Sequence, residues 1–131
     1  MARKKLTKIK TLKRNLDNIF SKYIRMRDTE DGYGACISCK KVFPYEKLDC
    51  GHFIGRAKLK TRWDERNCNG QCQNCNRFRD GEQALYLVAL EEKYGREVVD
   101  ELMAARYQTF KVNRQFYVEM IEKYKSLINE L

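Results

Sequence analysis

Proline, histidine and tryptophan are nearly absent from this chain, which has one of each among its 131 residues: Pro44, His52 and Trp63. It also lacks low-complexity tracts and internal repeats. Its longest apolar run, at 84–90, has seven residues, and a bilayer requires roughly 20. No long apolar run follows the basic N-terminus, so a secretory signal is not expected. We therefore expect neither a membrane protein nor a secreted one.

The composition is that of a folded chain, with 43% hydrophobic and 34% charged residues. Such a composition is not typical of disordered proteins, and this length corresponds to one domain. Within a single domain over 1–131, we expect three segments. They are a basic helical arm at 1–28, a cysteine-bearing module at 29–80 and C-terminal helices at 81–131.

Positive charge dominates the chain, because 27 Lys and Arg stand against 18 Asp and Glu for a net charge of +9. It is concentrated in two places: residues 1–28 hold ten basic and two acidic side chains, and residues 51–80 hold seven and three. A basic surface attracts phosphate polyanions and releases their counterions on binding. The charge favours a nucleic-acid partner, although a solvated lysine-rich helix face would give the same excess.

Apolar periodicity predicts helices at about 11–27, from residue 72 to a glycine cap at Gly95, at about 96–106 and at about 113–130. The first has Lys13, Arg14, Lys22 and Arg25 on its polar face. Between the helices, the pieces at 41–43 and 48–54 resemble short strands. A two-stranded hairpin there would be marginal alone, so a metal is physically reasonable.

The last predicted helix carries a heptad seam made of Tyr117, Met120, Tyr124, Leu127 and Leu131. The seam can pack on the chain's own domain, which we expect, or form a homodimer contact. Fewer than three heptads make a weak coiled-coil pattern, so the sequence leaves both open.

Four cysteines form two close pairs, Cys36-x-x-Cys39 and Cys72-x-x-Cys75. In a reducing compartment such pairs indicate metal or redox chemistry before disulfides, whereas a secreted chain with six cysteines would form up to three bridges. Four thiolates at this spacing match a structural zinc site. Such a site has no open coordination position, so the zinc would stabilise the fold and not catalyse.

Two further cysteines, Cys50 and Cys68, lie outside these pairs. They are expected to be small buried residues, unless one replaces a ligand of the pairs. Three polar residues lie near these pairs in the sequence. His52 in LDCGHFIGR and Asn67 in DERNCNGQC lie between the two pairs, and Asn76 comes directly after Cys75. A lone histidine is usually a packed or surface residue, and here it is also a candidate zinc ligand.

This order, Cys-x-x-Cys, His, Asn and Cys-x-x-Cys-Asn, resembles the zinc-bearing form of the HNH nuclease family, as an H-N-N variant. More closely, the chain resembles the NinG (Rap) recombination proteins of lambdoid phages. The resemblance rests on FSKYIRMRD, CISC, DCGHFIGR, TRWDERN, QCQNCN and LEEKYG, and it covers about residues 16–102.

The resemblance implies an α+β fold, a treble-clef ββα-metal module with flanking helices. It also implies a metal-dependent endonuclease acting on branched DNA such as Holliday junctions or D-loops. His52 would be the general base, since imidazole titrates near neutral pH. Asn67 would orient the imidazole through a carbonyl hydrogen bond, and Asn76 would offer an oxygen to Mg²⁺ or Mn²⁺.

The chain departs from the family at Gly51, where many HNH enzymes have an Asp or His metal ligand before the histidine. A cation held by Asn76 alone would bind weakly, so a carboxylate is expected. Asp49 is the nearest and Asp64 is a second candidate. Either could instead be an ordinary surface or loop-capping acid.

Basic residues crowd the loop between His52 and Asn67, and we expect them to position the phosphate backbone. They are Arg56, Lys58, Lys60, Arg62 and Arg66. Trp63 in the same loop could stack on an exposed base, although a core position is more usual for a large aromatic in a small module.

Two alternatives from other classes remain: a zinc-finger nucleic-acid-binding protein that cleaves nothing, and a zinc-stabilised protein-interaction module. A requirement for Mg²⁺ or Mn²⁺ would separate the nuclease from the first. The resemblance also implies a phage or prophage origin, hence the cytoplasm of the host cell. A cutter of symmetric junctions would usually be a homodimer.

Overall fold

A computed structural model describes residues 6–131, so the first five residues of the basic arm lie outside it. The helices are α1 (Ile9–Arg27), α2 (Leu59–Arg62), α3 (Gln83–Tyr94), α4 (Arg96–Ala105) and α5 (Arg114–Asn129). The strands are β1 (Tyr33–Ala35), β2 (Val42–Pro44), β3 (Leu48–His52) and β4 (Cys68–Cys72), with short turns η1 (Tyr45–Lys47) and η2 (Asn74–Phe78). The strands form two antiparallel pairs, β1–β2 and β3–β4. The predicted α+β class is confirmed.

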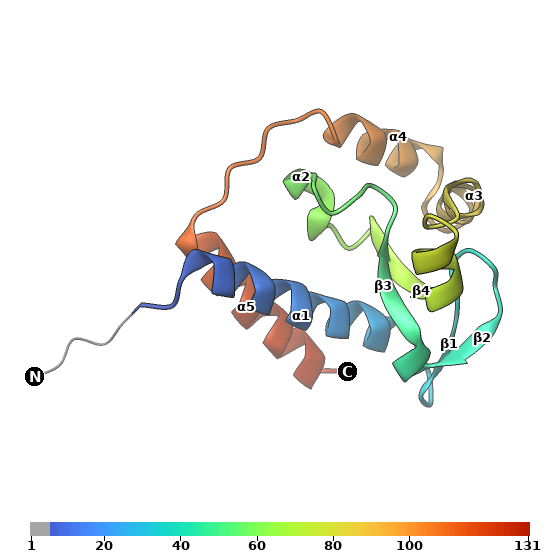
Figure 1. Cartoon of the computed structure of the whole chain (residues 1–131), viewed down its shortest axis with the longest axis horizontal. Coiled ribbons are helices and arrows are strands. Elements are labelled where there is room, and N and C mark those ends of the chain that lie inside the picture. Colours follow the sequence, from blue (N-terminus) through green and yellow to red (C-terminus); the bar gives the residue numbers. More distant parts are fainter. Residues whose placement is uncertain (1–5) are drawn as a thin grey trace, which may run out of the picture.

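Helices α1 and α5 lie side by side and enclose one hydrophobic core (Figure 1). The α1 residues Leu16, Phe20 and Ile24 recur every four positions and are fully buried, as expected for an amphipathic helix. The Phe20 ring meets the Tyr124 ring edge-on at 5.0 Å between centroids. Trp63 joins this core, 6% exposed, so the core position expected for it is confirmed.

The heptad seam of α5 is used within the chain. Tyr117 and Tyr124 are buried against α1, and Met120 and Leu127 pack against the same core. Only Leu131, the last residue, is exposed. Packing on the chain's own domain is therefore confirmed, and a homodimer through this seam would have to separate α5 from α1.

A second core lies on the other side of β3–β4, where α3 and α4 pack on the chain that follows β3. It contains Phe53, Tyr86, Leu90, Val99 and Leu102. The backbone at Gly95, φ +93°, separates α3 from α4 as predicted. The β3–β4 hairpin thus stands between the α1–α5 pair and the α3–α4 pair (Figure 1).

The helix predicted to begin at residue 72 is broken. A single π-helical turn, η2, ends at Phe78, and α3 begins only at Gln83. Between them, Asp80, Gly81 and Glu82 have positive φ angles of 50°, 79° and 46°. Left-handed residues cannot continue a right-handed helix. The Gly81 carbonyl also accepts a 2.7 Å hydrogen bond from Gln71, which fixes the turn against β4.

Arg27 and Asp28 at the end of α1 connect this helix to β4. The Arg27 guanidinium donates to the carbonyl of Cys68 at 2.9 Å, and Asp28 accepts from the Gly70 N–H at 2.8 Å. Because these bonds satisfy backbone groups on the edge of β4 that does not pair with β3, they hold the central hairpin on α1. None of the described helices combines the length and the apolar character needed to cross a membrane.

Candidate active site and metal centre

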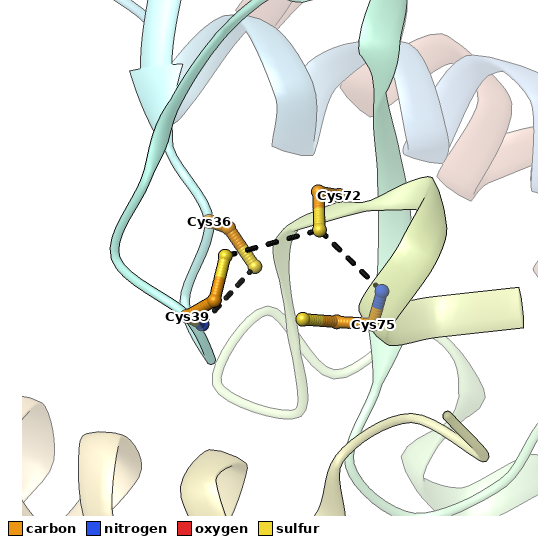
Figure 2. Close-up of side chains that lie close together, drawn as sticks. All are labelled: Cys36, Cys39, Cys72 and Cys75. Atoms are coloured by element: carbon orange, nitrogen blue, oxygen red, sulfur yellow. Dashed lines mark hydrogen bonds between the residues drawn. The ribbon is translucent and has the colours of Figure 1, made fainter. Parts of the chain in front are cut away.

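The four paired cysteines converge, as the spacing predicted (Figure 2). Cys36 and Cys39 come from the loop after β1, Cys72 ends β4 and Cys75 lies in η2. All four sulfur atoms lie within 4.8 Å of one another, and the Cys39 and Cys72 sulfurs are 3.9 Å apart. A tetrahedral zinc site with Zn–S bonds of about 2.3 Å places its sulfurs about 3.8 Å apart. The cluster could therefore hold a metal ion such as zinc.

Backbone N–H groups support the first sulfur of each pair. Cys39 N–H points at the Cys36 sulfur over 3.5 Å, and Cys75 N–H at the Cys72 sulfur over 3.4 Å. Burial raises the pKa of the Cys36 thiol, but N–H donors from neighbouring backbone outweigh it and lower that pKa overall. Burial raises the pKa of the Cys75 thiol. Filling the cluster with a metal must therefore release protons.

The cysteine loop is fixed to β4 by two hydrogen bonds. Ile37 N–H donates to the Gly70 carbonyl at 2.9 Å, and the Gln71 amide donates to the Ser38 hydroxyl at 2.9 Å. Both cysteine pairs are therefore attached to the central hairpin. The neighbouring cleft is built on the same hairpin.

His52 ends β3 and lies between two adjoining cavities of about 400 and 340 Å³. Its Nε2 is 2.9 Å from the Arg62 carbonyl oxygen. A carbonyl can only accept, so Nε2 carries the proton and Nδ1 keeps a lone pair. Burial lowers the pKa of His52, an effect that the Arg62 carbonyl opposes and nearby Arg56 reinforces. The imidazole is thus neutral at pH 7 and able to accept a proton.

Asp49 and Asn76 meet in the cleft, although they lie 27 residues apart in sequence. The Asn76 amide donates to an Asp49 oxygen at 2.9 Å, and the Arg77 guanidinium binds both oxygens of that carboxylate at 2.9 and 2.8 Å. Asp49 lines the larger cavity and Asn76 the smaller one, on either side of His52. Asp64 instead pairs with Arg66 at 3.1 Å and lines neither cavity.

The role expected for Asn67 is wrong in one respect, because its side chain does not bond to His52. The side chain is fully buried, and its oxygen accepts from Ile54 N–H at 2.8 Å. Its amide nitrogen donates to the carbonyls of Ile54 and Thr61, both at 3.0 Å. Asn67 therefore closes the loop between β3 and β4. The carbonyl that holds His52 belongs to that loop, so Asn67 acts on the imidazole only indirectly.

The predicted phosphate-binding loop is largely engaged in ion pairs. Arg62 and Arg56 bind the Asp17 carboxylate of α1 at 2.6 and 2.9 Å, and Arg66 binds Asp64 and Glu101. Lys58 and Lys60 are exposed, and the Lys60 ammonium lies 5.1 Å from the centre of the Phe110 ring. The ion pairs of Arg62 and Arg66 therefore stabilise the fold, and neither guanidinium is free to bind phosphate without breaking them.

Asp17 is one of two site residues that sequence reasoning missed. Its carboxylate accepts from Arg62, from Arg56 and from the Trp63 indole at 2.9 Å. Burial raises its pKa, but the Arg62 bond and charge outweigh burial, so the pKa is lowered overall. Arg77 was missed as well. An acidic residue on the polar face of a basic helix carries no pattern that would single it out.

Comparison with known proteins agrees with the resemblance seen in the sequence. The family model described as "Bacteriophage Lambda NinG protein" matches residues 1–131. Over 81 residues, the chain is 37% identical to Protein ninG of Escherichia phage 933W and of Salmonella phage P22, and 36% identical to that of Escherichia phage lambda. The match covers 61% of this chain and 38% of each relative's length. No solved structure matches the chain. The chain belongs to the NinG family of phage proteins.

Proposed function

We propose that this protein is a metal-dependent endonuclease of the HNH type that hydrolyses phosphodiester bonds in DNA. The observation that carries the proposal is the setting of His52. Its imidazole is neutral, anchored through Nε2, and placed in a cleft where an aspartate and an asparagine meet. A neutral base beside oxygen ligands is what hydrolysis of a phosphodiester requires.

In this mechanism Nδ1 of His52 accepts a proton from the water that attacks phosphorus. A new bond forms between the water oxygen and phosphorus, and the bond from phosphorus to the 3′ oxygen breaks. The 3′ oxygen takes a proton from solvent water and leaves as a hydroxyl. The hydrogen bond from Nε2–H to the Arg62 carbonyl keeps the ring oriented and stabilises the imidazolium that forms. The role of Asn67 is to hold the loop that supplies this carbonyl.

Asp49 and Asn76 would hold the catalytic cation, Mg²⁺ or Mn²⁺, because carboxylate and amide oxygens suit hard ions. When bound, that cation supplies positive charge to the phosphoryl oxygens and to the leaving oxygen. Asp49 already binds a cation of another kind, the guanidinium of Arg77. A metal ion at this site would displace the Arg77 guanidinium, which binds both carboxylate oxygens.

The four-cysteine cluster would hold zinc in a structural role, as part of a treble-clef ββα module. The order of elements supports this assignment. A loop bearing Cys36 and Cys39 precedes the β3–β4 hairpin, and Cys72 and Cys75 follow at the start of a helical turn. Four sulfur ligands leave no open position on zinc.

DNA would be held by the basic side chains that remain accessible. Lys8, Lys10, Arg14 and Lys22 of the α1 region, and Lys58 and Lys60 of the loop, are exposed. Arg56 is 58% exposed, so its ion pair with Asp17 is weak and exchangeable for a phosphate. Preference for branched recombination intermediates follows from the resemblance to NinG (Rap) proteins alone.

The second candidate function is DNA binding without cleavage, which the same exposed basic side chains favour. A matched pair of carboxylate variants separates the two. With Mg²⁺, Asp49→Asn should lower cleavage of a synthetic four-way junction at least ~100-fold, whereas Asp64→Asn should cleave like the wild type. DNA affinity and zinc content should stay unchanged in both. Equal cleavage by the two variants would contradict the assigned cation site, and binding without cleavage under every metal would favour the second candidate.

A further inference from the structure

A second group of metal-ligating side chains lies on the central hairpin, separate from the four-cysteine cluster. It consists of Cys50, His52 and Cys68, whose ligand atoms all lie within 4.8 Å of one another. Cys50 and His52 are two positions apart on β3 and therefore share a face of the strand. Cys68 is paired with His52 across the antiparallel ladder. The hairpin register thus brings two thiols and an imidazole together.

The chemistry of the three side chains suits a soft or borderline divalent cation. Zinc with two cysteine ligands and one histidine places its ligand atoms about 3.5–3.8 Å apart, so the group needs only a small closure. Two thiolates and a neutral imidazole balance the charge of a divalent cation. A balanced charge matters here because Cys68 is fully buried.

One side of the group is open. Cys50 and His52 line both cavities of the cleft, whereas Cys68 is enclosed by the core between α1 and α5. Three protein ligands would therefore leave a coordination position facing the cleft. Magnesium would not compete for this site, because hard cations take oxygen ligands.

We propose that Cys50, His52 and Cys68 form a second metal site that binds zinc or a similar soft cation and thereby withdraws His52 from proton transfer. Zinc would then have two opposite effects on this protein. In the four-cysteine cluster it stabilises the fold, and on the hairpin it blocks the cleft. The inhibitory effect rests on the proposed function, whereas the binding of the metal does not.

Cadmium titration of the full-length chain followed by ¹¹³Cd NMR tests the binding directly. At saturation the wild type should give two resonances, one from four sulfur ligands and a second, upfield, from two sulfurs and one nitrogen. Cys50→Ser and His52→Ala should each lose the second resonance and keep the first. Asp49→Asn should keep both, because it alters only the proposed oxygen site. A single resonance in saturated wild type would overturn the proposal, whatever the variants do.

Zinc inhibition of cleavage is the second test, with each variant's rate in excess zinc divided by its own rate without it. In constant Mg²⁺, excess zinc should lower the wild-type rate at least tenfold, which is a ratio of 0.1 or less. The ratio should stay near one for Cys50→Ser. An equal fall in both would overturn the inhibitory role. Two cadmium resonances in a protein that never cleaves DNA would support the metal site and contradict the proposed function.

Discussion

The side chain of Gln71 occupies the space that a side chain at Gly51 would need. A Cβ atom at position 51 would lie 2.2 Å from the Gln71 Oε1 atom and 2.8 Å from its Cβ. Gln71 cannot move away easily, because its amide nitrogen is bonded to Ser38 and to the Gly81 carbonyl. This contact leaves no room for a metal ligand directly before His52. The carboxylate in the cleft comes instead from Asp49, two positions earlier on the strand.

Gly51→Ala should destabilise the fold by about 1–3 kcal/mol, because the added methyl overpacks a fully buried contact. Gly55→Ala is the matched control, since nothing lies within 4 Å of the added Cβ and the backbone there is not left-handed. The control should be neutral or slightly stabilising, by up to ~1 kcal/mol. Chemical denaturation monitored by circular dichroism measures both. Equal free energies of unfolding for the two variants would show that the Gln71 side chain can move aside without destabilising the fold.

Asp17 should make the protein sensitive to acid. Its pKa in the folded state lies below the unfolded value, so it stabilises the fold above the unfolded pKa of about 3.9. That contribution is lost as the pH falls through this value toward the folded pKa. Asp17→Asn should cost about 1–3 kcal/mol at pH 7 and flatten the acid limb of the stability curve. The exposed Asp100→Asn serves as the control and should leave both unchanged.

Removal of the zinc proposed for the four-cysteine cluster should unfold the centre of the molecule. A chelator should abolish the cooperative thermal transition, because both cysteine pairs are attached to β4 and a two-stranded hairpin is marginal alone. The zinc affinity should weaken as the pH falls, since binding releases thiol protons. A competing zinc indicator, read at several pH values, measures this dependence. A transition that survives complete zinc removal would contradict the structural role.

The pH dependence of cleavage tests the state of His52. Burial lowers its pKa below the ordinary 6.5, so the neutral, active imidazole persists at pH values where a typical histidine is protonated. The rate should therefore fall only below the ordinary histidine range as the pH decreases. A profile of kcat/KM against pH at constant Mg²⁺ reports this pKa. A midpoint above 6.5 would contradict the buried, neutral base.

Much of this fold was predictable because its patterns are local. Leu16, Phe20 and Ile24 recur at helical spacing, and Cys36, Cys39, Cys72 and Cys75 have the spacing of one metal cluster. The chain has one histidine, and it lies between the two cysteine pairs, so His52 was the one candidate imidazole for the site. The approximate bounds of α1, α4 and α5 and the convergence of the four sulfurs follow from these rules, whereas the start of α3 does not.

The rest depends on contacts between residues far apart in sequence. Asp17 and Arg62 are 45 positions apart, and nothing in either segment indicates that they meet. Asn67 was assigned to His52, but buried backbone groups of the loop take up its amide. The break at Gly81 was missed although residues 79–83, RDGEQ, include no apolar side chain and Asp-Gly favours a turn, which the Gln71 amide fixes. Tertiary hydrogen bonds decided each of these cases.

Cleavage of a synthetic four-way junction, beside a linear duplex of matched sequence, shows whether the protein is a nuclease that uses His52 as its base. Wild type and His52→Ala would be compared with Mg²⁺, with Mn²⁺ and with EDTA, after confirming that both keep the metal of the four-cysteine cluster and bind DNA equally. We expect metal-dependent cleavage by the wild type that is lost in His52→Ala, with the junction cut faster than the duplex. Cleavage that persists in His52→Ala, or wild-type binding with no cleavage in either metal, would contradict this expectation.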